Sequence, residues 1–225
     1  MKAIESALFH RVVPPLEDSP GPHPALFLLH GRGADEQDLL GLAPALNPHL
    51  LLLAVRAPFP FMLSGGYTWY DVQTIGTPHP KMFAESYDRL LRFLDDALAA
   101  YPIDRSRVLL FGFSMGAVMS CAIALTRPEL IRGVVAHSGY IPEETSLRFR
   151  WNDLADTAFL IAHGTDDPII SVDYARRARE LLSSSSARAL VREYPIGHTI
   201  SEESLADCVS WMRPLLTPHG SASSP

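Results

Sequence analysis

The stretch VLLFGFSMGAVMSCAIAL (residues 108–125) decides the fold of this chain. Its apolar first part predicts a buried strand, and its last part can continue as a helix. Between them lies Gly112-Phe113-Ser114-Met115-Gly116, a G-x-S-x-G sequence. Glycines two positions before and after the serine permit a tight strand-to-helix turn, because larger side chains there would collide with the neighbouring strand and helix. The stretch predicts a serine held above the carboxyl end of a strand. A passive serine in a glycine-rich turn is the alternative, which the flanking strand and helix disfavour.

Short apolar runs alternate with longer segments of helical periodicity on both sides of this turn. Near-continuous apolar character is typical of strands that are covered on both faces. We therefore expect an α/β fold with a mostly parallel central sheet, helices on both faces and no large lid domain. The expected strands are residues 9–13, 25–30, 50–58, 108–113, 134–139, 158–164 and 189–195, and the expected helices include residues 82–100 and a capped final helix from Ser201 to Leu216.

Length and charge limit the domain count and the classes of partner. A chain of 225 residues suits one domain, which we place over residues 1–216, with residues 217–225 as a disordered tail. The formal net charge of −6 argues against a partner that is nucleic acid or an anionic membrane, since both attract basic surfaces. The sequence contains no run of apolar residues long enough to cross a membrane, so no membrane insertion is expected. Two widely spaced cysteines, Cys121 and Cys208, do not form a disulfide framework, and we expect a cytoplasmic protein with reduced thiols.

A serine hydroxyl needs a base to become a nucleophile, and the sequence offers one downstream. Asp167 follows the predicted strand 158–164, and His198 lies in the loop between the last predicted strand and the final helix. The order Ser114, Asp167, His198 is that of α/β-hydrolase catalytic triads. Asp166 is the competing carboxylate, but Asp167 is preferred because the residue before Pro168 is held extended.

The remaining histidines are weaker candidates for the base. His30 and His163 precede glycines at strand ends, where hydrogen bonding to loop backbone is more common, and a structural role is favoured for His137. Since His198 must be neutral to accept the serine proton, activity should fall in acid.

An oxyanion hole requires two backbone amides close to Ser114. Met115, directly after the serine, supplies one, and Arg32 in the turn Gly31-Arg32-Gly33 is the expected second donor. The same turn lacks the spacing of a dinucleotide or phosphate loop. No cluster of His, Cys, Asp and Glu has metal-ligand spacing, so neither a metal nor another cofactor is expected.

Several motifs together resemble the phospholipase/carboxylesterase family of α/β hydrolases, which includes bacterial carboxylesterases and acyl-protein thioesterases. The resemblance covers most of residues 24–215 and implies a serine hydrolase acting on carboxylic esters or thioesters, with the triad and oxyanion donors on the residues named above. Family members that act on long acyl chains commonly carry a small hydrophobic residue at the position of Arg32, and many carry glutamine at that of Met115. The matching motifs are LHGRGADEQDLLGLAP (29–44), GYTWYD (66–71), GFSMGA (112–117), HSGY (137–140), HGTDDPII (163–170) and GHTIS (197–201).

The substrate pocket is expected beside the aromatic-rich loop of residues 59–71. Ordinary core packing is the alternative for these side chains, and the apolar residues 59–63 leave a pocket rim and a homodimer contact both open. The expected substrate-contacting residues are Met62, Leu63, Tyr67, Trp69, Tyr140 and Ile169.

The favoured function is that of a carboxylesterase acting on small-molecule esters, because the chain length leaves no room for a large lid. The alternative is an acyl thioesterase or lysophospholipase acting on acyl-protein or lipid substrates. A dienelactone-type hydrolase usually carries cysteine at the nucleophile position, and a binding module without turnover would not need the triad.

Overall fold

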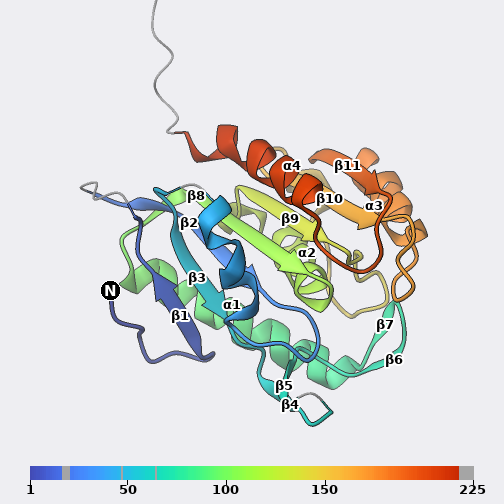
Figure 1. Cartoon of the computed structure of the whole chain (residues 1–225), viewed down its shortest axis with the longest axis horizontal. Coiled ribbons are helices and arrows are strands. Elements are labelled where there is room, and N and C mark those ends of the chain that lie inside the picture. Colours follow the sequence, from blue (N-terminus) through green and yellow to red (C-terminus); the bar gives the residue numbers. More distant parts are fainter. Residues whose placement is uncertain (17–20, 47, 64, 218–225) are drawn as a thin grey trace, which may run out of the picture.

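Seven strands form one twisted sheet in the order β1-β3-β2-β8-β9-β10-β11 (Figure 1). The computed structural model describes residues 1–16, 21–46, 48–63 and 65–217. All neighbouring strands are parallel except β1, which pairs antiparallel with β3 at the edge. The strands of this sheet are β1 (His10–Val13), β2 (His23–Leu29), β3 (Leu51–Val55), β8 (Ile103–Phe113), β9 (Gly133–His137), β10 (Ala158–Gly164) and β11 (Arg188–Tyr194).

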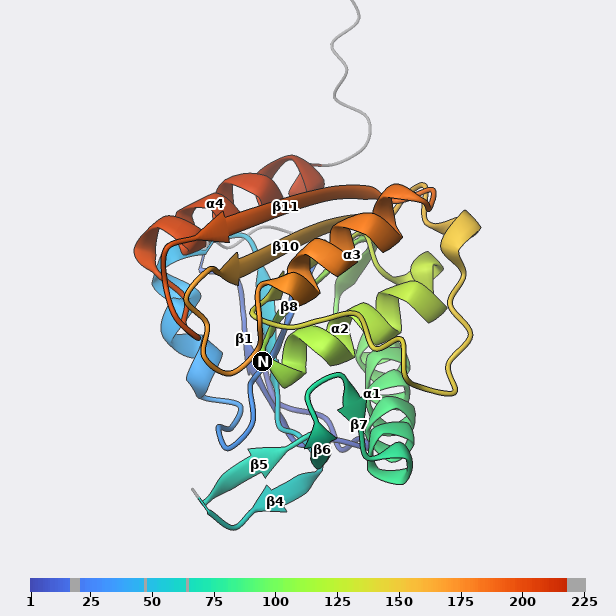
Figure 2. The same cartoon turned by 90° about the vertical axis from the view of Figure 1, so that its right-hand side faces the viewer.

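Helices cover both faces of the sheet, as the α/β pattern predicts (Figure 2). Alternate strand residues face two separate cores: Phe27 and Leu110 pack with α1, α2 and α3, whereas Leu28 and Phe111 pack with η1 and α4. Parallel strands that are buried on both sides must be apolar at successive positions. The helices are η1 (Asp38–Ala45), α1 (Pro80–Ala100), α2 (Met115–Thr126), η2 (Pro128–Leu130), η3 (Trp151–Asp153), α3 (Asp173–Ser183), α4 (Glu202–Met212) and η4 (Arg213–Leu216).

The boundaries of the predicted elements shift by a few residues. Helix α1 begins at Pro80 rather than at residue 82, because the His79 side chain caps it by accepting a hydrogen bond from the Met82 amide. Strand β8 extends back to Ile103 through residues that are not continuously apolar. The confirmed result is the mostly parallel sheet with helices on both faces.

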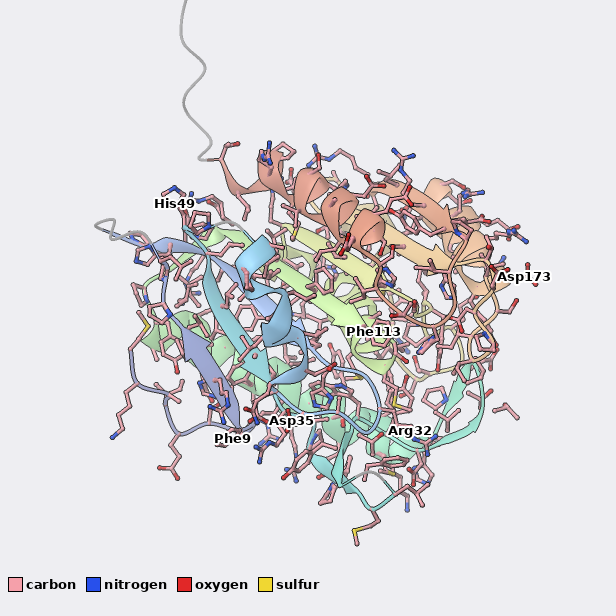
Figure 3. The ribbon with its side chains drawn as sticks, viewed as in Figure 1. Phe9, Arg32, Asp35, His49, Phe113 and Asp173 are labelled. Carbon is pink, nitrogen blue, oxygen red and sulfur yellow. The ribbon has the colours of Figure 1, made fainter. Side chains whose placement is uncertain are left out.

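Two short antiparallel hairpins follow β3, and the first of them lies within residues 59–71, where the sequence predicted a loop. The first pairs β4 (Phe59–Phe61) with β5 (Gly66–Thr68), and the second pairs β6 (Val72–Thr74) with β7 (Thr77–Pro78). An isolated bridge between Ala34 and Tyr67 joins the first hairpin to the loop after β2. That loop carries Arg32, which lines the same cavity as Phe113 at the end of β8. Figure 3 labels both residues.

Two sequence-based expectations concern the ends of the chain. The single domain over residues 1–216 stays a prediction, and residues 218–225 of the expected tail lie outside the described residues. Over the part of the chain that the structure describes, no helix combines the length and apolar character needed to span a membrane.

Candidate active site

Ser114 occupies a strained turn between β8 and α2. Its φ of 53° and ψ of −118° place it in a conformation that residues with a side chain rarely adopt. A Cβ on Gly116 would collide with the carbonyl oxygen of Leu29, and one on Gly112 would collide with the backbone of Gly116. The Ser114 amide donates to the carbonyl oxygen of His137, 2.9 Å away, which ties the turn to β9. The glycines of the G-x-S-x-G sequence therefore permit a close approach of three backbones.

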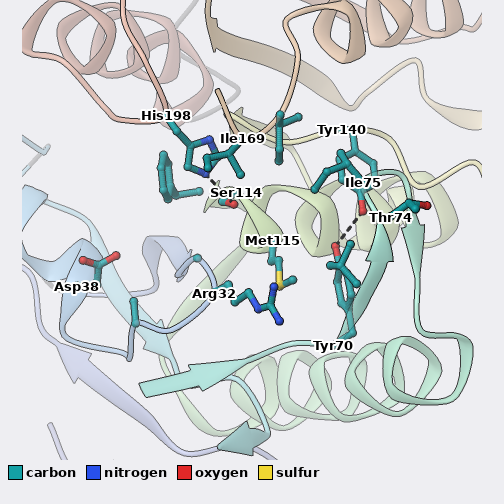
Figure 4. Close-up of a pocket in the computed structure, with 15 residues that line it drawn as sticks. Arg32, Asp38, Tyr70, Thr74, Ile75, Ser114, Met115, Tyr140, Ile169 and His198 are labelled. Atoms are coloured by element: carbon teal, nitrogen blue, oxygen red, sulfur yellow. Dashed lines mark hydrogen bonds between the residues drawn. The ribbon is translucent and has the colours of Figure 1, made fainter. Parts of the chain in front are cut away.

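His198 and Asp167 converge on this serine from two other loops. Figure 4 shows His198 beside Ser114. The His198 Nε2 atom lies 3.0 Å from Ser114 Oγ, and His198 Nδ1 lies 2.7 Å from Asp167 Oδ2. The Phe113 ring packs against the His198 imidazole with ring centroids 5.0 Å apart. This is the geometry in which an imidazole can take a proton from the serine while a carboxylate holds its tautomer.

The Asp167 carboxylate is fixed by backbone amides as well as by the histidine. Its Oδ1 atom accepts hydrogen bonds from the amides of Ile169 at 2.8 Å and Ile170 at 2.9 Å. Burial opposes ionisation, but the hydrogen bonds from Ile170, His198 and Ile169 outweigh it and hold the pKa of Asp167 below its ordinary value. The competing Asp166 is exposed, and its amide donates to Ile196. The structure therefore brings Asp167, and not Asp166, to the histidine.

Buried imidazoles surround the site without reaching the serine. His137 and His163 are fully buried; His137 lies 3.0 Å from Ser204 Oγ, and His163 Nε2 lies 2.9 Å from the Ile170 carbonyl oxygen. Burial lowers the pKa of His163, and burial together with the neighbouring imidazoles lowers that of His137 to about 3. Both rings are therefore neutral at pH 7.

The loop after β2 brings Gly31, which precedes Arg32, close to Ser114. A Cβ on Gly31 would lie 3.4 Å from the Ser114 Cβ, which shows how closely the loop approaches the serine. The next amide, that of Gly33, donates to Tyr67, whereas the described residues contain no backbone acceptor for the amides of Arg32 and Met115. An oxyanion hole consists of two backbone amides near the nucleophile that are free to donate hydrogen bonds to the substrate.

A buried ion cluster behind this loop was not predicted from the sequence. The Glu36 side chain is fully buried and accepts hydrogen bonds from Arg56 and Arg11 at 2.6 to 3.1 Å. Burial opposes its ionisation, but the two guanidinium groups overcome this and lower the pKa of Glu36 to about 2. The Arg56 guanidinium also lies between the rings of Phe9 and Tyr67. The cluster connects β1, the Arg32 loop and the first hairpin.

A cavity of about 540 Å³ opens above Ser114. This volume suits a small ligand. Tyr140 and Ile169, two of the expected substrate-contacting residues, line it together with Tyr70 of the expected pocket loop. Thr74 and Ile75, which the sequence did not single out, line it as well.

The other four expected residues lie outside the cavity lining. Met62 and Leu63 project from the first hairpin with 88% and 89% of their surface exposed. Trp69 is fully buried, and its indole donates to the carbonyl oxygen of His30. The Tyr67 hydroxyl accepts a hydrogen bond from Arg56. Trp69 and Tyr67 thus have structural partners, as the core-packing alternative requires.

The profile of the phospholipase/carboxylesterase family matches residues 15–216 of this chain. The chain belongs to this family. Membership makes it a hydrolase of the α/β-hydrolase fold that acts on esters, as the resemblance implied.

Similar proteins include both types of enzyme that the sequence suggested. Acyl-protein thioesterase 1 of Candida albicans is 29% identical over 210 residues, which are 84% of this chain and 90% of that protein. The crystal structure of the Bacillus cereus carboxylesterase has a TM-score of 0.81 at 25% identity and covers 92% of this chain and 94% of that one. The Mesorhizobium loti carboxylesterase shares the fold with a TM-score of 0.82 at 24% identity, over 94% of this chain and 97% of that one.

Among the described residues, no group of three or more His, Cys, Asp and Glu side chains is arranged to hold a metal ion. That the reaction needs no cofactor stays a prediction.

Proposed function

We propose that the protein is a serine carboxylesterase that hydrolyses small carboxylic esters through an acyl-enzyme intermediate. The observation that supports this most strongly is the continuous chain of contacts from Ser114 through His198 to Asp167. A cavity opens directly above the serine, as a reacting ester requires.

In the first half of the reaction His198 removes the Ser114 proton while the serine oxygen attacks the ester carbonyl. The amides of Arg32 and Met115 donate to the oxyanion, and Met115 stands at the positive end of the α2 dipole. His198 then returns the proton to the departing alcohol. Asp167 keeps the proton-bearing Nδ1 atom of the histidine oriented throughout.

In the second half water takes the place of the alcohol. His198 removes a proton from this water, the resulting hydroxide attacks the acyl carbon, and the proton returns to Ser114 as the acid leaves. Atoms and charges balance with no group other than the ester and water. The triad, the serine nucleophile and the two oxyanion donors are all parts of this proposal.

The second candidate is an acyl thioesterase or lysophospholipase, because several similar proteins bear the name acyl-protein thioesterase 1. Parallel assays with oxyesters and thioesters of acetate, butyrate and palmitate separate the two. Small-ester hydrolysis predicts that kcat/KM falls from butyrate to palmitate, and a palmitoyl thioester as the best substrate would support the second candidate.

The direct test of the nucleophile is labelling with a fluorophosphonate probe. Wild-type protein should be labelled on Ser114, and Ser114→Ala should lose the label and at least about 10³-fold of kcat. The matched control is Ser120→Ala in α2, whose hydroxyl bonds to the Gly116 carbonyl oxygen. An unlabelled wild-type protein, or label retained by Ser114→Ala, would contradict the proposal.

A cytoplasmic location and a homodimer also stay predictions. Cell fractionation tests the first, and sedimentation equilibrium tests the second.

A further inference from the structure

One side of the cavity contains two phenol groups that face each other, those of Tyr70 and Tyr140. The hydroxyl oxygens of Tyr70 and Tyr140 lie 3.4 Å apart (Figure 4). Both side chains line the cavity, although Tyr70 is fully buried and Tyr140 is only 5% exposed. The remaining lining on this side includes the apolar side chains of Val72 and Ile75. The two hydroxyls are therefore polar groups within a mainly apolar part of the cavity lining.

The hydrogen bonds of this pair do not use both hydroxyl hydrogens. One tyrosine donates to the other, and the hydrogen of the acceptor has no further partner among the described residues. Whichever tyrosine is the donor, one O–H group of the pair is left over, without an acceptor among the described residues.

The leftover group remains a donor at neutral pH. Burial raises the pKa of Tyr70 well above its ordinary value, and burial also raises that of Tyr140. A buried donor without an acceptor is costly, so a site of this kind favours a ligand that supplies an oxygen.

The pair is also held in place before any ligand arrives. The Tyr70 ring packs edge-on against Phe83, and the Tyr140 ring packs against Tyr174. The Tyr174 hydroxyl donates to the carbonyl oxygen of Ile75 at 2.8 Å, which fixes the second hairpin beside Tyr140. A preorganised donor loses little entropy when it binds an acceptor.

We propose that the Tyr70–Tyr140 hydroxyl pair is a specificity determinant that donates a hydrogen bond to a neutral oxygen on the substrate, away from the reacting ester. The enzyme then selects esters with a keto or ether oxygen in the acyl or alcohol part over hydrocarbon esters of the same shape. This inference rests on the proposed function, since it assigns a substrate class to the same cavity.

The test compares esters that differ only in this oxygen. On the acyl side, para-nitrophenyl 4-oxopentanoate is paired with the 4-methylpentanoate, and the 5-oxohexanoate with the 5-methylhexanoate. On the alcohol side, 3-oxobutyl acetate is paired with 3-methylbutyl acetate. In wild-type protein we expect kcat/KM to favour the keto member of at least one pair by about tenfold. In the double variant Y70F/Y140F this preference should fall to about one.

The control variant is Tyr87→Phe, which removes a phenol hydroxyl that contacts Thr126, outside the cavity lining. It should keep the preference. Fluorophosphonate labelling of Ser114 in every variant reports whether the catalytic site is intact.

Each outcome bears on a different claim. Equal kcat/KM for both members of every pair, with Ser114 labelled, overturns this inference and leaves the proposed function standing. A preference that survives in Y70F/Y140F assigns oxygen recognition to another group, such as the Arg32 guanidinium, and also overturns it. Absence of labelling and turnover in wild-type protein overturns the proposed function together with this inference.

Discussion

The two walls of the cavity are built by different means. On the catalytic wall, Ser114 is set by its own backbone, with glycine approaches that no side chain could replace. On the opposite wall, the cavity is lined by residues 70, 72, 74 and 75 of the hairpin region 59–78. This region is positioned by side chains such as Tyr174 and Thr68, whose hydroxyl reaches the Met115 sulfur at 3.4 Å. Backbone constraints fix the chemistry, whereas side-chain contacts set the shape of the pocket. Substitutions on the catalytic wall should therefore cost far more activity than those on the hairpins.

The largest effect after loss of the serine is expected at the carboxylate behind His198. In Asp167→Asn the amide group can present an N–H to His198 Nδ1, which favours the wrong tautomer of the histidine. We expect kcat to fall by about 10³-fold or more, measured with a butyrate ester. Asp166→Asn is the matched control and should stay within about twofold, since Asp166 is exposed. A large loss in Asp166→Asn with normal Asp167→Asn activity would reverse the assignment.

The next effect concerns the buried cluster that joins the two walls. In Glu36→Ala the Arg56 guanidinium loses its carboxylate partner while most of its surface stays covered. We expect the free energy of unfolding to fall by about 3 kcal/mol, measured by urea denaturation.

Glu85→Ala gives the comparison for this variant, because it breaks an exposed pair between Glu85 and Arg89. Its cost should be less than about 0.5 kcal/mol. Equal destabilisation by both variants would show that the Glu36 cluster contributes no more than a surface pair.

The catalytic wall could largely be predicted from the sequence because its determinants are local. Apolar runs indicate buried strands, and the two glycines of the G-x-S-x-G sequence indicate a tight turn at the serine. Asp167 was preferred over Asp166 because it precedes Pro168, whereas in the structure its carboxylate is fixed by the amides of residues 169 and 170. The amide bonds are a long-range consequence of the folded loop that the proline alone does not reveal.

The hairpin wall could not be predicted in the same way. Its strands are only two or three residues long, too short for a period-two pattern to stand out. The aromatic composition of the loop predicts that Trp69 faces the substrate, but its indole is buried and donates a hydrogen bond to the His30 carbonyl oxygen. Glu36, Arg11 and Arg56 are separated by 20 or more positions, so nothing in the sequence pairs them.

A smaller effect is expected from the neutral imidazoles beneath the catalytic wall. Because the pKa of His137 in the folded protein is about 3, the unfolded chain binds a proton between about pH 6.5 and pH 3 that the folded protein does not. The free energy of unfolding should therefore decrease as the pH is lowered from about 6.5 to about 3, by about 1.4 kcal/mol per pH unit for one such group. His137→Gln should reduce this slope between pH 4 and pH 6, as measured by urea denaturation. An unchanged slope would show that His137 does not contribute.

The smallest effect is expected at the tip of the first hairpin. Met62 and Leu63 are almost fully exposed and lie outside the cavity lining, so the double variant M62S/L63S should keep kcat/KM on a butyrate ester within about twofold. A tenfold loss would mean that the tip contacts the substrate.

Sedimentation of the same variant tests whether copies of the chain associate through this tip. Two exposed apolar side chains at a hairpin end can favour such a contact, and their loss would then lower the mass without altering the chemistry of Ser114. The hairpin tip would in that case mediate association, separately from catalysis at Ser114.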